Sequence, residues 1–265
     1  MRWLRASLGL VLALAGATTG HAQDLDKLSA DFENPLANVA RLAFNGASIF
    51  DEGRFQRTGY VLDIRPSVPI RFTSDMSVLF RADVPLADQP FGRLARVRGF
   101  GDTLLQAIAV PRSQGGLSWG VGGALQLPTR SEVALDDGMY GAGLVGTVVQ
   151  SSGPWLFGAT VSQLWSIGHP DRTETPFNTM LLQPFATYRF GAGWSANFSP
   201  QLLVDWLAPS GQQLRTPLAA TLTKVFVVAN QPMAISAGAT YVPVRPDNAS
   251  DWNLRASYTL IFPVN

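Results

Sequence analysis

Few residues of this chain have the chemistry of a catalytic centre. The 265-residue sequence contains no Cys and only two His, His21 and His169. His169 lies near Ser166 and Asp171, so a hydrolase that uses this histidine is one interpretation. An ordinary loop histidine is the simpler one, because no second catalytic motif accompanies it. We therefore predict no catalytic residue and no enzyme, and keep a lipid-modifying hydrolase using His169 as the alternative.

Metal and cofactor sites have equally little support. The sequence has no HExxH motif and no His/carboxylate cluster. Asp136 and Asp137 could together bind Ca²⁺, although two adjacent loop carboxylates are usually only solvated. The GxG pieces at 99–101 and 120–122 fall within expected strands and open no helix, which argues against a dinucleotide site. We predict neither a cofactor nor a metal.

The polar residues are more informative where they alternate with apolar ones. Residues 194–206, reading WSANFSPQLLVDW, place apolar side chains at every second position. Successive strand side chains point to opposite faces, so this pattern predicts a strand with one apolar and one polar face. About twelve steps of roughly 3.3 Å, tilted by about 45°, rise about 28 Å, which is close to the apolar band of an outer-membrane barrel. A strand of a soluble sandwich is usually half as long.

The N-terminus predicts export. The chain opens MRWLR, continues with an apolar run over residues 8–15 and reaches GHA at 20–22, as a secretory signal peptide does. Cleavage after Ala22 removes Arg2 and Arg5 and leaves 18 basic against 19 acidic residues, a balance that argues against a nucleic-acid partner. No later stretch of about 18 apolar residues occurs, so transmembrane helices are not expected.

The rest of the chain divides into twelve apolar-rich segments. Short links alternate with longer ones, as the periplasmic turns and outer loops of a membrane barrel do. We therefore predict an all-β fold: an antiparallel transmembrane β-barrel of about 12 strands over residues 42–265, after a signal peptide (1–22) and a periplasmic arm (23–41). A frayed arm is the simpler interpretation of the arm, and a lumen plug or lid is the alternative. The expected strands are 42–53, 58–72, 76–86, 100–112, 117–128, 139–150, 155–166, 178–190, 194–206, 213–228, 232–243 and 252–262, and the longest outer links include 87–99.

The alternation also predicts which residues line the pore. Charges inside a barrel must be paired or wet, so the inward set either fills the lumen with ion pairs or forms a constriction that selects solutes. Arg65 and Arg81 are expected at similar depth, near Asp63 and Asp83, where they could bind the hydroxyl of a phenol. The predicted pore-lining residues are Asp63, Arg65, Arg81, Asp83, Gln183, Gln201, Asp205 and Arg255.

Tryptophans mark the expected strand ends. Trp prefers the membrane–water interface, where the ring is buried and the N–H stays hydrated. Lys224 breaks the outward apolar pattern of its strand and is expected to extend its stem to the periplasmic interface. The predicted aromatic girdle is Trp119, Trp155, Trp165, Trp194, Trp206 and Trp252.

Several short motifs resemble one family of Gram-negative outer-membrane proteins. They are GFGDTLLQ (99–106), WGVGGALQLPT (119–129), GPWLFGA (153–159), LLQPF (181–185), VRPD (244–247) and LIFP (260–263). The family is associated with the phenol meta-cleavage pathway and is often mislabelled neuromedin U. The resemblance covers most of the mature chain and carries no catalytic residues. The chain departs from many outer-membrane proteins by not ending on an aromatic residue.

The resemblance implies a transporter of small organic compounds. We expect a passive outer-membrane channel for small solutes, including aromatic or hydrophobic ones, with outer-membrane lipids as surroundings and the barrel-assembly machinery as a partner during biogenesis. Besides the hydrolase, a barrel that serves only envelope structure is the remaining alternative.

Overall fold

The computed structural model describes residues 19–112, 115–168 and 176–263. One helix, α1 (Thr19–Glu33), precedes the strands and begins inside the predicted signal peptide. The strands in chain order are β1 (Val39–Glu52), β2 (Arg57–Arg71), β3 (Met76–Phe91), β4 (Ala95–Phe100), β5 (Thr103–Pro111), β6 (Leu117–Leu127), β7 (Tyr140–Ser152), β8 (Trp155–Gly168), β9 (Asn178–Gly191), β10 (Trp194–Pro200), β11 (Leu202–Asp205), β12 (Leu214–Arg215), β13 (Leu218–Val228), β14 (Gln231–Tyr241) and β15 (Trp252–Pro263), with a short 3₁₀ helix η1 (Val133–Leu135) before β7.

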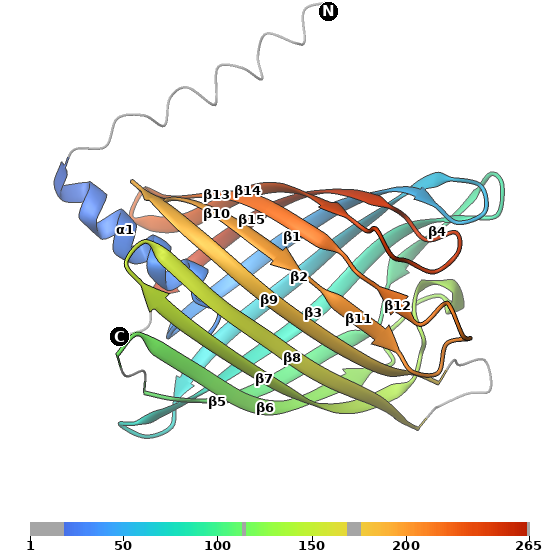
Figure 1. Ribbon diagram of the computed structural model, residues 1–265, viewed down its shortest axis with the longest axis horizontal. Helices are drawn as coiled ribbons and strands as arrows, with labels where there is room; N and C mark the ends of the chain where they lie inside the picture. Colours follow the sequence, from blue (N-terminus) through green and yellow to red (C-terminus); the bar gives the residue numbers. More distant parts are fainter. Residues whose placement is uncertain (1–18, 113–114, 169–175, 264–265) are drawn as a thin grey trace, which may run out of the picture.

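These strands form one closed antiparallel barrel (Figure 1). The first strand β1 pairs with both β2 and the last strand β15, while β10 pairs with both β9 and β13, so the sheet closes on itself. Three of the strands that span the barrel are each divided into two labelled pieces: β4 and β5, β10 and β11, and β12 and β13. The described chain therefore makes a twelve-stranded barrel, which confirms the predicted fold class.

One proline explains two of the interruptions. Gln201, between β10 and β11, donates its backbone N–H to the carbonyl of Pro217, which lies between β12 and β13. Proline has no N–H to return, so the ladder loses a bond at this level on both strands. The register is unchanged across the gap, since Phe198 pairs with Ala186 and Leu202 with Leu182 on β9. The stretch 194–206 therefore keeps one apolar face, as its sequence predicts.

The two faces of the barrel wall differ in polarity. On β10, Trp194 and Phe198 are 38% and 50% exposed, whereas Ser195 and Ser199, which directly follow them, are 0% and 7% exposed. Large apolar side chains are exposed in the same alternating way on β2, β6 and β8. An outward apolar face and an inward polar one are what a barrel in a lipid bilayer needs.

The two ends of the barrel differ in their connections. At the end that holds α1, the described connections are the turns at 72–75, 153–154, 192–193 and 229–230 (Figure 1). Ala229 and Asn230 both have positive φ, as the commonest two-residue hairpin turn requires. At the other end lie the longer connections, including 128–139 and 242–251.

The prediction that residues 87–99 form a loop is wrong. The strand β3 continues to Phe91 and pairs with β4 as a hairpin that turns at residues 92–94. Across this hairpin Asp88 forms ion pairs with Arg96 and Arg98. Pro85 and Pro90 break the apolar alternation, and the charged pairs make these residues resemble a loop in the sequence.

The N-terminal segment packs inside the end of the barrel that carries the short turns. Leu28, Phe32 and Ala37 contact a buried cluster of Val39, Val225, Ala234 and Ile261. Leu36 joins a second cluster formed by the barrel side chains Leu79, Ile108, Val110, Val145, Val149 and Leu156. The inner wall is therefore apolar where this segment covers it. In the described part of the chain no helix is long and apolar enough to cross a membrane.

Candidate functional site in the barrel lumen

A cavity of about 390 Å³ lies in the lumen between the N-terminal segment and the inner wall. Most residues of its lining are polar, with hydroxyl, amide and charged side chains from strands on several sides of the barrel. Phe32, Leu181 and Phe185 add apolar surface. The polar and charged lining includes Glu33, Arg41, Asn45, Arg65, Ser67, Arg81, Asp83, Gln106, Thr160, Gln183, Asn197, Ser199, Ser257 and Thr259.

The register of β2 and β3 brings opposite charges together in this cavity. Ile64 pairs with Val84 and Ser67 with Arg81, so Arg65 lies opposite Asp83. The Arg65 guanidinium forms an ion pair with the Asp83 carboxylate. Asp63 and Arg255 lie close enough to act electrostatically on this pair, which makes one charged network across β2, β3 and β15.

Two further arginines bind the N-terminal segment. The Arg41 Nη2 donates to the carbonyl oxygens of Asp31 at 2.7 Å and of Asn34 at 2.8 Å. The Arg41 guanidinium also lies over the Phe32 ring, 5.6 Å from its centroid. Arg81 Nη2 donates to the Pro35 carbonyl. The end of α1 and the segment after it are thus fixed to the inner wall by hydrogen bonds from guanidinium groups to main-chain oxygens.

Sequence reasoning missed Arg41. The residue fell in the predicted arm, because the first strand was expected at 42 and its pattern was poor. Strand β1 begins at Val39, and Arg41, Ala43 and Asn45 all line the cavity. Their spacing of two was the signal that could have identified Arg41 as an inward side chain.

The predicted pore-lining residues fall into three groups. Arg65, Arg81, Asp83 and Gln183 line the cavity, and the Gln183 side chain donates to the Ser199 hydroxyl at 2.9 Å. Asp63 and Arg255 belong to the adjoining network. The lining of this cavity does not include the other two: Gln201 lies at the break opposite Pro217, and the Asp205 carboxylate accepts the backbone N–H of Leu207 at the end of β11.

All six predicted girdle tryptophans are exposed on the barrel. Their exposed fractions range from 38% for Trp194 to 49% for Trp206 and Trp252. Three of them lie near the short turns, namely Trp119, Trp155 and Trp194. The other three lie toward the longer connections, namely Trp165, Trp206 and Trp252. Lys224 is buried; its Nζ donates to the Ala192 carbonyl and lies 5.2 Å from the Trp194 ring centroid. Its amine therefore reaches the turn at residues 192–193.

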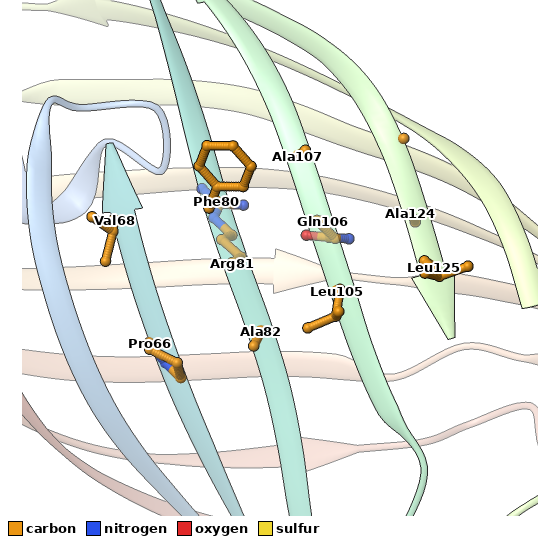
Figure 2. Close-up of a pocket in the computed structure, with 11 residues that line it drawn as sticks. Pro66, Val68, Phe80, Arg81, Ala82, Leu105, Gln106, Ala107, Ala124 and Leu125 are labelled. Atoms are coloured by element: carbon orange, nitrogen blue, oxygen red, sulfur yellow. The ribbon is translucent and has the colours of Figure 1, made fainter. Parts of the chain in front are cut away.

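A second hollow lies on the outer surface of the barrel. It measures about 610 Å³ and is lined mostly by apolar side chains of β2, β3, β5 and β6, including Val68, Phe80 and Leu105 (Figure 2). Arg81 and Gln106 line both this hollow and the lumen cavity. The wall between the two is therefore one strand layer thick at this place.

Of the two loop carboxylates considered for Ca²⁺, Asp136 accepts hydrogen bonds from the backbone, as the nearby Asp102 does. The Asp136 carboxylate accepts the N–H groups of Asp102 and Asp137, and the Asp102 carboxylate accepts those of Arg130 and Gly138. Burial, then the charges of Asp136, Asp102 and Asp205, raises the pKa of Asp137 to about 6. No group of three or more His, Cys, Asp or Glu in the described residues could hold a metal ion. His169 lies outside the described residues.

Comparison with solved structures gives the same architecture. No known family's sequence profile matches the chain, and no curated protein matches it. The COG4313 outer membrane channel from Pseudomonas putida F1 aligns with a TM-score of 0.63 at 14% identity, over 84% of this chain and 94% of that one. The chain has the fold of an outer-membrane barrel. The NanC porin aligns with a TM-score of 0.56 at 10% identity, over 84% of this chain and all of that one.

Proposed function

We propose that this protein is a passive outer-membrane channel for small organic solutes. The observation that supports it best is the charged cavity inside a closed barrel whose outer face is apolar. A barrel needs only apolar or paired side chains to fill its interior, so a polar cavity indicates a path for solute. Outer-membrane lipids surround it, and the barrel-assembly machinery inserts it.

The path runs past the charged residues of the lumen. In this proposal Arg65, Arg81, Asp83 and Gln183 line its narrow part, with Asp63 and Arg255 toward the longer loops. Gln201 and Asp205 lie further along the wall, also toward the longer loops. The N-terminal segment narrows the end that carries the short turns, since Leu36 and Phe32 pack into it.

The solutes we propose are small and include aromatic compounds. The resemblance of the sequence motifs to the family associated with phenol degradation supports this choice. The aromatic side chains Phe32 and Phe185 in the cavity lining support it independently. The two solved structures described above are a channel and a porin, which supports transport over catalysis.

Liposome swelling with the refolded protein tests the proposal. Sugars, amino acids and phenols are offered in turn, and liposomes without protein measure how fast each solute crosses the lipid alone. Swelling that depends on the protein is the expected result for at least one small organic solute. Swelling rates equal to those of empty liposomes for the whole panel would contradict the proposal and favour a barrel that serves only envelope structure.

A further inference from the structure

The lumen cavity carries more positive than negative charge. Its lining contains three arginines, Arg41, Arg65 and Arg81, and two carboxylates, Glu33 and Asp83. Only Arg65 is neutralised directly, by its ion pair with Asp83. Within the described part of the chain, no carboxylate forms an ion pair with Arg41 or Arg81.

The acceptors of these two arginines are neutral. Arg41 donates to the carbonyls of Asp31 and Asn34, and Arg81 to that of Pro35. A carbonyl satisfies a donor but does not cancel its charge. The Nε of Arg41 is buried without a hydrogen-bond partner among the described residues. Arg81 also faces the like charges of the other two cavity arginines.

Neighbouring charges do not remove this excess. Asp63 lies near Arg65 and Arg255, so one carboxylate there serves two guanidinium groups. Glu33 and Asp31 both act on Arg41, although Asp31 is attracted more strongly to Lys27, and the single carboxylate of Asp83 acts on both Arg65 and Arg81. Enclosed charges that lack a counter-ion are costly, which favours an anion from solution.

The shape and polarity of the cavity define the anion. A carboxylate matches the fork of a guanidinium group, and the aromatic rings of Phe32 and Phe185 line the same space. The volume of about 390 Å³ lies within the range of small-molecule sites, roughly 300–1,000 Å³. We propose that the cavity binds an aromatic monocarboxylate of the benzoate class, with its carboxylate at Arg41 and Arg81. This inference rests on the proposed function, because it names the class of solute that the channel selects.

Calorimetric titration of the folded protein in detergent micelles tests the charge requirement. Sodium benzoate is compared with benzamide, a neutral molecule of the same shape, and both are titrated into protein-free micelles as blanks. We expect benzoate to bind at least about tenfold more tightly, because only it forms charge-assisted hydrogen bonds with arginine. Equal affinities for the two ligands would overturn the proposal.

Variants assign the binding to the two arginines. Arg41→Gln and Arg81→Gln should each weaken benzoate binding about tenfold, whereas Arg81→Lys, which keeps the charge, should retain most of it. Arg98→Gln is the matched control, since its side chain is 72% exposed on the outer hairpin. Heat-dependent gel mobility identifies the folded barrels. Benzoate binding that is unchanged in both glutamine variants, or lost equally in Arg81→Lys and Arg81→Gln, would overturn the assignment.

Liposome swelling separates this inference from the proposed function. If solutes cross but benzoate binds no better than benzamide, the channel stands and the anion site fails. If benzoate binds in an arginine-dependent way while no solute crosses, the site stands and the channel fails.

Discussion

At the scale of single residues, neighbouring positions on one strand meet different solvents. On β15, Ala256 is exposed on the outer face, and the next residue, Ser257, lines the lumen cavity. An Arg at the bilayer midplane of a barrel costs roughly 2–4 kcal/mol. Ala256→Arg should therefore lower the unfolding free energy in lipid by about that amount, and Ser257→Arg by much less. Denaturant unfolding of both variants measures this, and equal losses would contradict the assigned faces.

Asp137 makes the outer loop sensitive to pH. Its pKa is raised to about 6 by burial and by the neighbouring carboxylates, above the ordinary 3.8. The folded loop therefore binds the proton more tightly than the unfolded loop does. Ionised Asp137 therefore destabilises the folded loop fully above pH 6, and this destabilisation is relieved as pH falls from 6 toward 4. We expect amide exchange in loop 128–139, corrected for its intrinsic pH dependence, to slow on acidification. Asp137→Asn should abolish this change, and an unaltered profile in that variant would assign the effect elsewhere.

Sequence alternation locates many charged lumen residues but not their partners. Arg65 and Asp83 are identified as inward because each stands between apolar neighbours, and the β2–β3 register then pairs them. The hydrogen bond from Arg81 to Pro35 joins residues 46 positions apart, and no local pattern encodes it. Alternation fails in a different way at Leu79 and Ile108. These two residues point inward although they are apolar, because the N-terminal segment covers them.

At the scale of elements, the stretch 194–206 tests whether the wall separates lipid from water. Single Cys residues at Ala196, Phe198, Leu202 and Val204 should be shielded from a water-soluble thiol reagent, because lipid covers the outer face. Cys at Asn197, which lines the cavity, or at Gln201 should react through the lumen. The chain has no native Cys, so the background is clean. Equal labelling of both sets would show that this face does not meet lipid.

The N-terminal segment is the element that most restricts the lumen. It packs Leu36 and Phe32 against the inner wall before β1 begins at Val39. A protein that starts at Asn38 keeps every strand and should show a higher single-channel conductance in planar bilayers. Asp26→Ala is the control, since it removes a hydrogen bond to the Gly193 N–H and a charge near Lys224 at the rim but leaves the segment in place. Conductance equal to that of the full chain would mean that the segment does not limit the path.

The elements were predictable where the pattern is strictly local. The stretch 194–206 alternates throughout, and its strand pair survives the gap at Pro217 without a register shift. The hairpin of β3 and β4 was not predictable in this way, because prolines and paired charges replace the apolar alternation there. The docking of α1 depends on tertiary contacts that no local pattern encodes, such as the hydrogen bond from the Ser195 hydroxyl on β10 to Glu33.

At the scale of the whole molecule, the barrel separates an apolar exterior from a charged interior. Closure between β1 and β15 removes the sheet edge, and every described crossing pairs with two neighbours. The net charge near zero hides a lumen in which cavity arginines outnumber carboxylates. The function proposed here depends on that enclosed charge and not on the composition of the chain.

Planar-bilayer recording of the Arg65→Ala, Arg81→Ala double variant tests the central claim most directly. Two of the three cavity arginines are removed while Glu33 and Asp83 remain, so the lumen becomes wider and more negative. Single-channel conductance should rise and ion selectivity should shift toward cations. Arg96→Ala with Arg98→Ala, on the outer hairpin, is the matched control for lost arginines. A folded double variant that matches the wild type in both conductance and selectivity would contradict the claim that these arginines control a path through the barrel.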